Sequence, residues 1–105
     1  MIEIRGQSDP SIEAIAAALA SYGNAHADAE VVLYRQNSVS VRIRIIDPDF
    51  AGIAKADRHE TVWAYLNGLP DHVQSQVTLL LLLTPEETAM SFANVEFDNP
   101  IPSSL

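Results

Sequence analysis

The stretch Ser38-Val-Ser-Val-Arg-Ile-Arg-Ile-Ile46 decides the fold, because apolar and polar side chains alternate along it. A period of two is typical of a β-strand with one buried and one polar face. The apolar face would carry Val39, Val41, Ile43 and Ile45. The preceding segment, Glu30 to Arg35, is also rich in β-forming residues. Together the two segments predict an antiparallel β-hairpin, with Gln36-Asn37 or a longer loop as its turn.

A helix is predicted on each side of this hairpin. Residues 9–23 have Asp9 as a helix cap, Pro10 at the first helical position and Gly23 as a helix end. Residues 55–66 form the second helix, which Gly68 and Pro70 close. The expected inward residues are Ile12, Ile15, Leu19 and Tyr22 in the first helix and His59, Val62, Trp63 and Leu66 in the second.

The second half of the chain continues with a short helical turn at residues 71–76 and a strand at residues 77–83. The strand contains five consecutive leucines, which favours a strand covered on both faces. Thr84-Pro-Glu-Glu87 is typical of a helix start with a capping box, so we expect a helix at residues 85–93. In the tail, residues 95–97 are a candidate short strand, and the prolines of residues 99–105 oppose regular structure.

The element order is therefore helix-strand-strand-helix-strand-helix in a single α+β domain, with a core at about residues 9–93 and a tail at residues 94–105. The strand at residues 38–46, the helix at 55–66 and the strand at 77–83 form a β-α-β unit. Such units have parallel strands and a right-handed connection. We therefore predict a three-stranded mixed sheet with the helices on one face. The other face, with Arg42 and Arg44, stays open unless the tail covers it.

Composition and charge exclude several classes of protein. The chain of 105 residues is 48% hydrophobic and 19% charged, which is typical of a single globular domain. Without cysteine it has no disulfide, thiolate metal site or cysteine nucleophile. The formal charge is −8, and all six basic residues lie at or before Arg58, so phosphate binding is disfavoured over most of the surface. No signal peptide or membrane span is recognisable, and we expect a cytoplasmic protein.

No sequence pattern favours an enzyme. A Gly-x-Ser-x-Gly elbow and a phosphate-binding glycine loop are both missing, and the four glycines are too far apart to form one. His26 and His72 each lie near an aspartate, and we interpret both as surface residues because further metal ligands cannot be placed. Asp47-Pro-Asp49 is interpreted as a turn, and His59 as a hydrogen-bonded structural residue. We predict no metal or other cofactor.

The middle of the chain resembles the BolA-like family, whose fold is similar to a type II KH domain. Residues 41–52 look like the family's second strand and its Phe-x-Gly turn, here Phe50-Ala-Gly52. Arg58-His59, Val62-Trp63 and Leu66 are similar to the family's helix pattern, and residues 84–87 look like its last helix start. The resemblance covers about residues 12–92. It implies a small, non-enzymatic domain that works by contact with other proteins.

Two departures concern the [2Fe-2S] cluster that members of this family share with monothiol glutaredoxins. The resemblance implies a histidine ligand at the start of the last strand, where this chain has Gln76. It also implies a cysteine or histidine in a long loop between the first two strands, which here is shortened to about Gln36-Asn37. An amide is a poor iron ligand beside imidazole or thiolate, so we expect no cluster bound by this chain itself.

These observations lead to a protein-binding hypothesis. We expect an adaptor or regulatory domain that binds a protein partner, with a glutaredoxin-like protein as one candidate, through the hairpin and the helix that contains Arg58. The candidate partner-binding residues are Arg42, Arg44, Phe50, Lys55 and Arg58. The alternatives are a KH-like nucleic-acid-binding domain, a cluster-sharing partner of a monothiol glutaredoxin, and a homodimer that pairs through a strand edge or the apolar tail.

Overall fold

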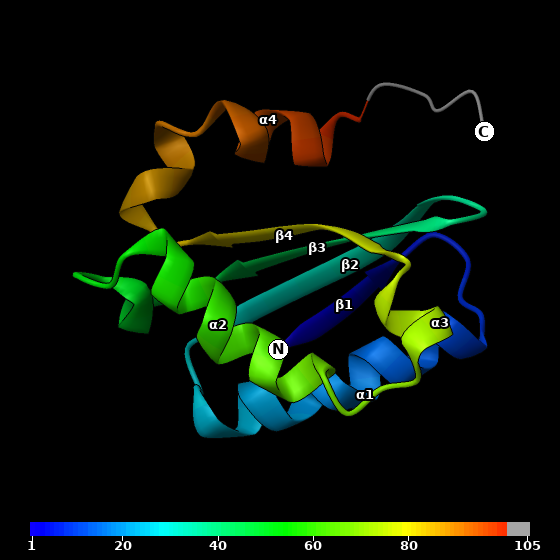
Figure 1. Cartoon of the computed structure of the whole chain (residues 1–105). Coiled ribbons are helices and arrows are strands. Elements are labelled where there is room, and N and C mark those ends of the chain that lie inside the picture. The colour runs from blue at the N-terminus through cyan, green and yellow to red at the C-terminus, as the bar shows by residue number, and fades with distance from the viewer. Residues whose placement is uncertain (101–105) are drawn as a thin grey trace.

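The predicted hairpin lies at the centre of the structure, a computed structural model that describes residues 1–100 (Figure 1). The hairpin consists of β2 (Glu30–Asn37) and β3 (Ser40–Ile46). The other elements are β1 (Ile2–Arg5), α1 (Pro10–Ala25), the 3-10 turn η1 (Pro48–Phe50), α2 (Lys55–Leu66), α3 (Asp71–Gln74), β4 (Val77–Leu83), the 3-10 turn η2 (Glu86–Ala89) and α4 (Phe92–Asp98). The chain is therefore an α+β domain, as the sequence predicts. The predicted tail beyond Pro100 lies outside the described residues.

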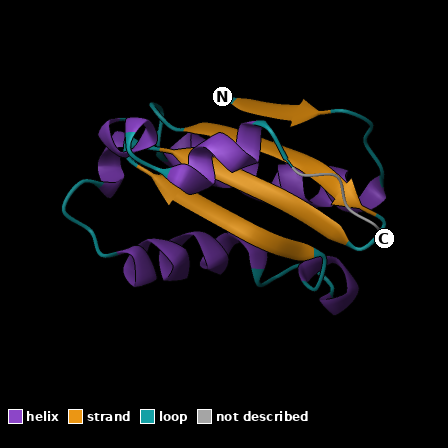
Figure 2. Ribbon diagram, turned by 90° about the horizontal axis from the view of Figure 1, so that it is seen from above, coloured by secondary structure: helices purple, strands orange, loops and turns teal. Residues whose placement is uncertain are grey.

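The four strands form one mixed sheet in the order β1-β2-β3-β4 (Figure 2). β2 and β3 are antiparallel and β3 and β4 are parallel, so both predicted pairings are confirmed. The prediction of three strands was wrong, because β1 adds a fourth strand parallel to β2. Ile2 and Ile4 alternate with polar residues in β1, but a strand of four residues gives only a weak periodic signal.

The two β-α-β connections of the sheet differ in hand. They start from β1 and β3, which run in opposite directions, and each moves the same way across the sheet. Because both connections place their helices on the same face, one of them must be left-handed (Figures 1 and 2). The connection from β3 through α2 to β4 is right-handed, as predicted. β1 therefore joins β2 through the rarer, left-handed connection.

The main core lies between the sheet and α1, α2 and α3. The predicted stripe of α1 is fully buried against the inward side chains of β2 and β3. Asp9 caps α1 as predicted, accepting a hydrogen bond from the N–H of Ile12 at 3.0 Å. With 16 residues α1 is the longest of the described helices, and none in residues 1–100 is long and apolar enough to cross a membrane.

The inward face of α2 differs from the prediction by one position. Its buried residues are Arg58, Val62 and Leu66, at intervals of four. His59 is exposed and stacks on Trp63, with the ring centroids 5.8 Å apart. The prediction of a buried His59 was therefore wrong, because the four-residue spacing from Leu66 leads to Arg58 instead. A charged residue thus occupies a position that a hydrophobicity pattern assigns to the surface.

The opposite face of the sheet is covered by α4, so the expectation that all helices lie on one face was wrong (Figure 1). Phe97 of α4 is fully buried and its ring lies 4.9 Å from that of Tyr34. Helical spacing explains this position, because Asn94 and Phe97 are three residues apart and both face the sheet. The candidate strand at residues 95–97 was therefore also wrong.

The predicted helix at residues 85–93 is divided by a turn. The capping box itself is confirmed, because the N–H of Thr84 donates to Glu87 Oε1 at 2.9 Å and the N–H of Glu87 donates to Thr84 Oγ1 at 3.3 Å. It begins only the short η2, however. Ser91 then caps α4 by accepting a hydrogen bond from the N–H of Asn94 at 3.1 Å. The break at Ser91 lets α4 turn back across the sheet.

Two turns also differ from the prediction. α1 continues past Gly23, because the N–H of His26 still bonds to helical carbonyl groups. The hairpin turn lies at Ser38 and Val39, since the pairing of β2 with β3 continues to Asn37. At Gly52, in contrast, the positive φ of 78° explains the glycine of the Phe-x-Gly turn before α2.

Candidate functional site

The five residues predicted to bind a partner lie in three different environments. Arg42 and Arg44 lie on the face of the sheet that α4 covers. Phe50 and Arg58 are buried, with 3% and 5% of their surface exposed. Lys55 is exposed at the start of α2. The structure therefore does not bring the five residues together as one basic surface.

The arginines of β3 bind carboxylates of α4. Arg42 Nη1 donates to both carboxylate oxygens of Glu96, at 2.9 and 2.8 Å. Arg44 Nη1 donates to Asp98 Oδ1 at 2.9 Å, and its guanidinium lies 4.8 Å from the centre of the Phe97 ring. Both arginines thus hold α4 on the sheet through the Nη1 donors of their guanidinium groups.

Arg58 links α2 to η2. Its Nη1 and Nη2 donate to the two oxygens of Glu87 at 2.6 and 3.1 Å, which is a bidentate pair. Its Nε donates to the carbonyl oxygen of Ile53 at 2.8 Å, and Phe50 lies beneath the guanidinium. The hydrogen bond from Arg58 lowers the pKa of Glu87 to about 2 from an ordinary value of 4.5. Arg58 and Phe50 therefore have a structural role in this chain.

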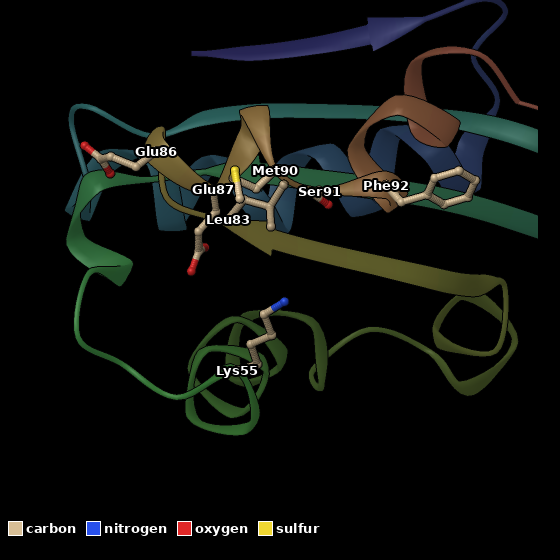
Figure 3. A pocket seen from close by; sticks show the side chains of 7 residues that line it. All are labelled: Lys55, Leu83, Glu86, Glu87, Met90, Ser91 and Phe92. Atoms are coloured by element: carbon tan, nitrogen blue, oxygen red, sulfur yellow. The ribbon is translucent and has the colours of Figure 1, made fainter.

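Lys55 differs from the five arginines, each of which forms an ion pair within the chain. The ammonium group of Lys55 forms neither a hydrogen bond nor an ion pair with any residue that the structure describes. Figure 3 shows Lys55 extending from α2 towards the end of β4, with the Glu87 carboxylate on the same side of the ribbon. Lys55 is therefore a cation available to a ligand.

Two adjoining cavities of about 430 and 360 Å³ share Lys55 as a lining residue. The first is lined by Lys55, Leu83, Glu86, Glu87, Met90, Ser91 and Phe92 (Figure 3). The second is lined by Lys55, Ala56, His59, Leu80, Leu81 and Leu82. We call these two cavities together the β4 groove. The groove follows the outer side of β4, between α2 and the segment that leads into α4.

The β4 groove combines charged and polar side chains with exposed apolar ones. Met90 and Phe92 are 89% and 85% exposed, although each presents a large apolar side chain. Leu80 and Leu81 are half-buried. Exposed apolar residues that lie together at a hollow often mark a protein-binding surface. The exposure of Met90 and Phe92 could not be predicted from the sequence, because both residues lie within a predicted helix that has no clear outward face.

β4 is also an edge strand, with only β3 paired to it among residues 1–100. Its outer side therefore presents backbone N–H and C=O groups that no strand pairs, although the carbonyl oxygen of Leu82 accepts a hydrogen bond from Arg58 Nη1 at 3.1 Å. Natural edge strands are usually protected by charged residues, proline or bulges, but residues 77–83 include neither a charge nor a proline. The one irregularity of its pairing lies near its beginning, next to Val41 and Arg42. The part of β4 before Leu82 is thus open to pairing with another extended segment.

Gln76, where the resemblance implies a histidine ligand, is engaged in hydrogen bonds. Its Oε1 accepts from Arg35 Nη2 at 2.8 Å, and its Nε2 donates to Ser11 Oγ at 3.0 Å and to the carbonyl oxygen of His72 at 2.9 Å. Arg35 also binds Asp9 and lowers the pKa of that carboxyl to about 2. Gln76 thus ties the start of β4 to α1.

One cluster of titratable side chains was missed by the sequence analysis. His26, at the end of α1, lies beside Asp47 and Asp49 in the turn after β3. In the sequence His26 lies near Asp28, and no pattern signals the contact, because His26 and Asp47 are 21 positions apart with the whole hairpin between them. Only the pairing of β2 with β3 brings the end of α1 and this turn together.

Comparisons with protein-family models, with curated proteins and with solved structures found no match. Membership of the BolA-like family therefore stays a prediction from the residue pattern between Phe50 and Leu66 and at residues 84–87.

Proposed function

We propose that this chain is a non-enzymatic protein-binding domain that captures an extended, apolar segment of a partner protein along β4. The segment would lie in the β4 groove as an added strand, and one of its carboxylates would pair with Lys55. The open edge of β4 beside two exposed apolar side chains is the observation that carries the proposal. It keeps the adaptor function expected from the BolA-like resemblance and moves the contact surface from the hairpin to β4.

The shape of the edge supports strand addition. In this mode, main-chain hydrogen bonds supply affinity, and pockets for alternate side chains supply specificity. β4 offers seven residues, which is the length of an ordinary strand, and residues of its C-terminal half line both cavities. Met90 and Phe92 would contact apolar side chains of the added segment on the α4 side.

The charge of the groove favours a foreign segment over a second copy. Each copy has a formal charge of −8, so two copies repel each other. Two glutamates, Glu86 and Glu87, line the groove beside Lys55, but Glu87 is already bound by Arg58, so Lys55 can attract a carboxylate of a partner. We do not extend the proposal to nucleic acid, because Arg42 and Arg44 are held by carboxylates of α4. The partner segment is thus expected to combine apolar residues with at least one acidic residue.

The test uses peptides of 12 residues selected from a random display library on the intact chain. We expect the selected peptides to combine apolar and acidic residues and to shift the backbone amide resonances of residues 77–83 in the labelled chain. Phe92→Ser and Lys55→Glu should each weaken binding by about tenfold, which corresponds to about 1.4 kcal/mol. Val39→Ser removes another exposed apolar side chain, at the hairpin turn, and should leave binding unchanged.

A charge exchange completes the test. A peptide whose acidic residue is replaced by lysine should bind Lys55→Glu better than it binds the unmodified chain. Failure to select any peptide, or peptides that bind all variants equally, would contradict the proposal. If sedimentation shows that the unmodified chain dimerises and that Phe92→Ser is monomeric, the groove is occupied by a second copy, and the proposed foreign segment is wrong.

A further inference from the structure

The end of α1 and the turn after β3 place one imidazole and two carboxylates together. His26 Nδ1 lies 2.9 Å from Asp49 Oδ2 and 3.4 Å from Asp47 Oδ2. The three donor atoms all lie within 4.8 Å of one another. Asp47 is fully buried and His26 is about one-quarter exposed, whereas Asp49 is largely open to solvent. The cluster is therefore anchored at its base and accessible from one side.

The distances between the donor atoms match those around a bound metal ion. With metal-to-ligand bonds of about 2.1 Å, neighbouring donors of an octahedral or tetrahedral ion lie about 3.0 to 3.4 Å apart. The two separations from His26 Nδ1 fall at about these values. Asp49 is exposed enough to rotate, so its carboxylate can complete the set without movement of the backbone.

Neighbouring groups hold two of the three candidate ligands in place. The hydroxyl of Tyr22 donates to Asp47 Oδ2 at 2.6 Å, and the N–H of Asp49 donates to Asp47 Oδ1 at 2.9 Å. The ring of Tyr22 stacks on His26 with the centroids 4.2 Å apart, which fixes the plane of the imidazole. Metal ligands in proteins are commonly oriented by such outer hydrogen bonds and packing.

A second feature at the same place also favours a cation. The cluster lies at the C-terminal end of α1, where the helix dipole presents partial negative charge. The last turn of α1 has no basic residue to balance that charge. Two carboxylates add to it, in a chain whose formal charge is already −8. The only basic group in the cluster is His26, which is itself a metal ligand when neutral.

We propose that His26, Asp47 and Asp49 form a binding site for a divalent transition-metal ion such as Zn²⁺. One nitrogen and two oxygen donors suit zinc and its neighbours, whereas an all-oxygen set would suit calcium or magnesium. Three protein ligands leave further coordination positions to water. The ion binds the lone pair of His26 Nδ1, with the ring proton on Nε2, and takes the place of the hydrogen bond between His26 Nδ1 and Asp49 Oδ2. Binding would join the end of α1 to the turn that leads into α2.

Zinc chloride is the probe for the test, titrated into the intact chain by calorimetry. We expect one ion per chain to bind at this site. His26→Gln and Asp49→Asn keep side chains of similar size and should each lower zinc affinity by at least about tenfold. Asp47 is not substituted, because its burial makes misfolding of the variant a competing explanation.

The matched control is His72→Gln, which removes an exposed histidine that, like His26, has an aspartate near it in the sequence, here Asp71. Its zinc affinity should equal that of the unmodified chain. Cobalt gives an independent readout, because visible absorption of bound Co²⁺ should depend on His26 and not on His72. If zinc binds all variants equally, or binds the unmodified chain only at millimolar concentrations, the cluster is a hydrogen-bonded link and the proposal is wrong.

Discussion

The two faces of the sheet are covered by helices in physically different ways. Against one face, α1 and α2 pack a continuous apolar core that includes Leu19, Ile43 and Leu66, all fully buried. Against the other face, α4 inserts Phe97 and surrounds it with ion pairs from Arg42 and Arg44. The first cover is thus held by burial of apolar area, and the second by one aromatic ring and partly exposed charges.

This difference indicates that α4 can detach from the sheet more easily than α1 or α2. α4 has seven residues and a single fully buried side chain, so little apolar area opposes its detachment. Docking of α4 also has an unfavourable free-energy contribution, because Arg44 Nε is buried without a hydrogen-bond partner among the described residues. We therefore expect local opening of α4 at a free energy well below that of global unfolding, while α1 and α2 open only with the whole domain.

The largest effect is expected from the main core. Leu66→Ala removes a fully buried side chain between α2 and the sheet and should lower the free energy of unfolding by about 2 to 5 kcal/mol. Urea denaturation at neutral pH measures the loss. A loss below about 1 kcal/mol would mean that α2 is not part of the cooperative core.

Phe97→Ala should have a smaller effect on global stability than Leu66→Ala, although it removes a larger side chain. The loss is limited to the free energy with which α4 docks, and we expect less than about 3 kcal/mol. Hydrogen exchange should show that amide protection falls in α4 and stays unchanged in α1. An equal loss of protection in both helices would show that the two faces unfold as one unit.

The Arg58–Glu87 pair links the two regions and gives a pH dependence. Because its folded pKa of about 2 lies below the ordinary 4.5, ionised Glu87 stabilises the fold above pH 4.5, and this contribution is lost as the pH falls towards 2. Glu87→Gln should therefore be less stable than the unmodified chain by about 1 kcal/mol at neutral pH. Urea denaturation at about pH 2 should show no difference in the free energy of unfolding between Glu87→Gln and the unmodified chain.

The neighbour Glu86 supplies the control for this pH dependence, because its side chain is exposed and outside the pair. Glu86→Gln should match the unmodified chain at every pH. A constant difference between Glu87→Gln and the unmodified chain down to pH 2 would contradict the assigned role of the Arg58 pair.

The smallest effect is expected for the ion pairs of α4. Glu96→Gln should lower the free energy of unfolding by less than about 1 kcal/mol, because the Arg42–Glu96 pair is partly exposed. Sodium chloride at high concentration screens the pair, so the difference from the unmodified chain should shrink with salt. Glu30→Gln, an exposed residue at the start of β2, should show no difference at low or high salt.

The sequence predicted the centre of the fold well because its signals there are periodic. The three- and four-residue spacing in α1 reports burial on one face and is confirmed. The alternation in residues 38–46 correctly placed Val41, Ile43 and Ile45 in the core, but the inward position of Val39 was wrong, because Val39 lies in the turn and is 55% exposed. The capping box at Thr84 and Glu87 was also found, since it depends on residues three apart in the chain. What followed the cap was not predictable, because the position of α4 depends on a distant contact between Phe97 and Tyr34.

The candidate sites were harder to predict than the fold. A charge pattern shows that Arg42 and Arg44 share a strand face, but it does not show that Glu96 and Asp98 return to cover them. The same holds for Arg58, whose buried pair with Glu87 crosses 29 positions of the chain. Lys55 is the one predicted residue that lines the β4 groove, and its neighbours Met90 and Phe92 were identified only from their exposure in the structure.

The left-handed connection from β1 to β2 has a consequence for how the chain reaches this structure. β2 and β3 are close in sequence and pair locally, and β4 joins through the common right-handed connection, whereas β1 joins through the uncommon one. We therefore expect β1 to be the last strand to join the sheet during folding. Until it does, the outer edge of β2 is open, and the N-terminal strand of a neighbouring chain can pair there instead. High concentration during refolding should accordingly favour strand-exchanged dimers.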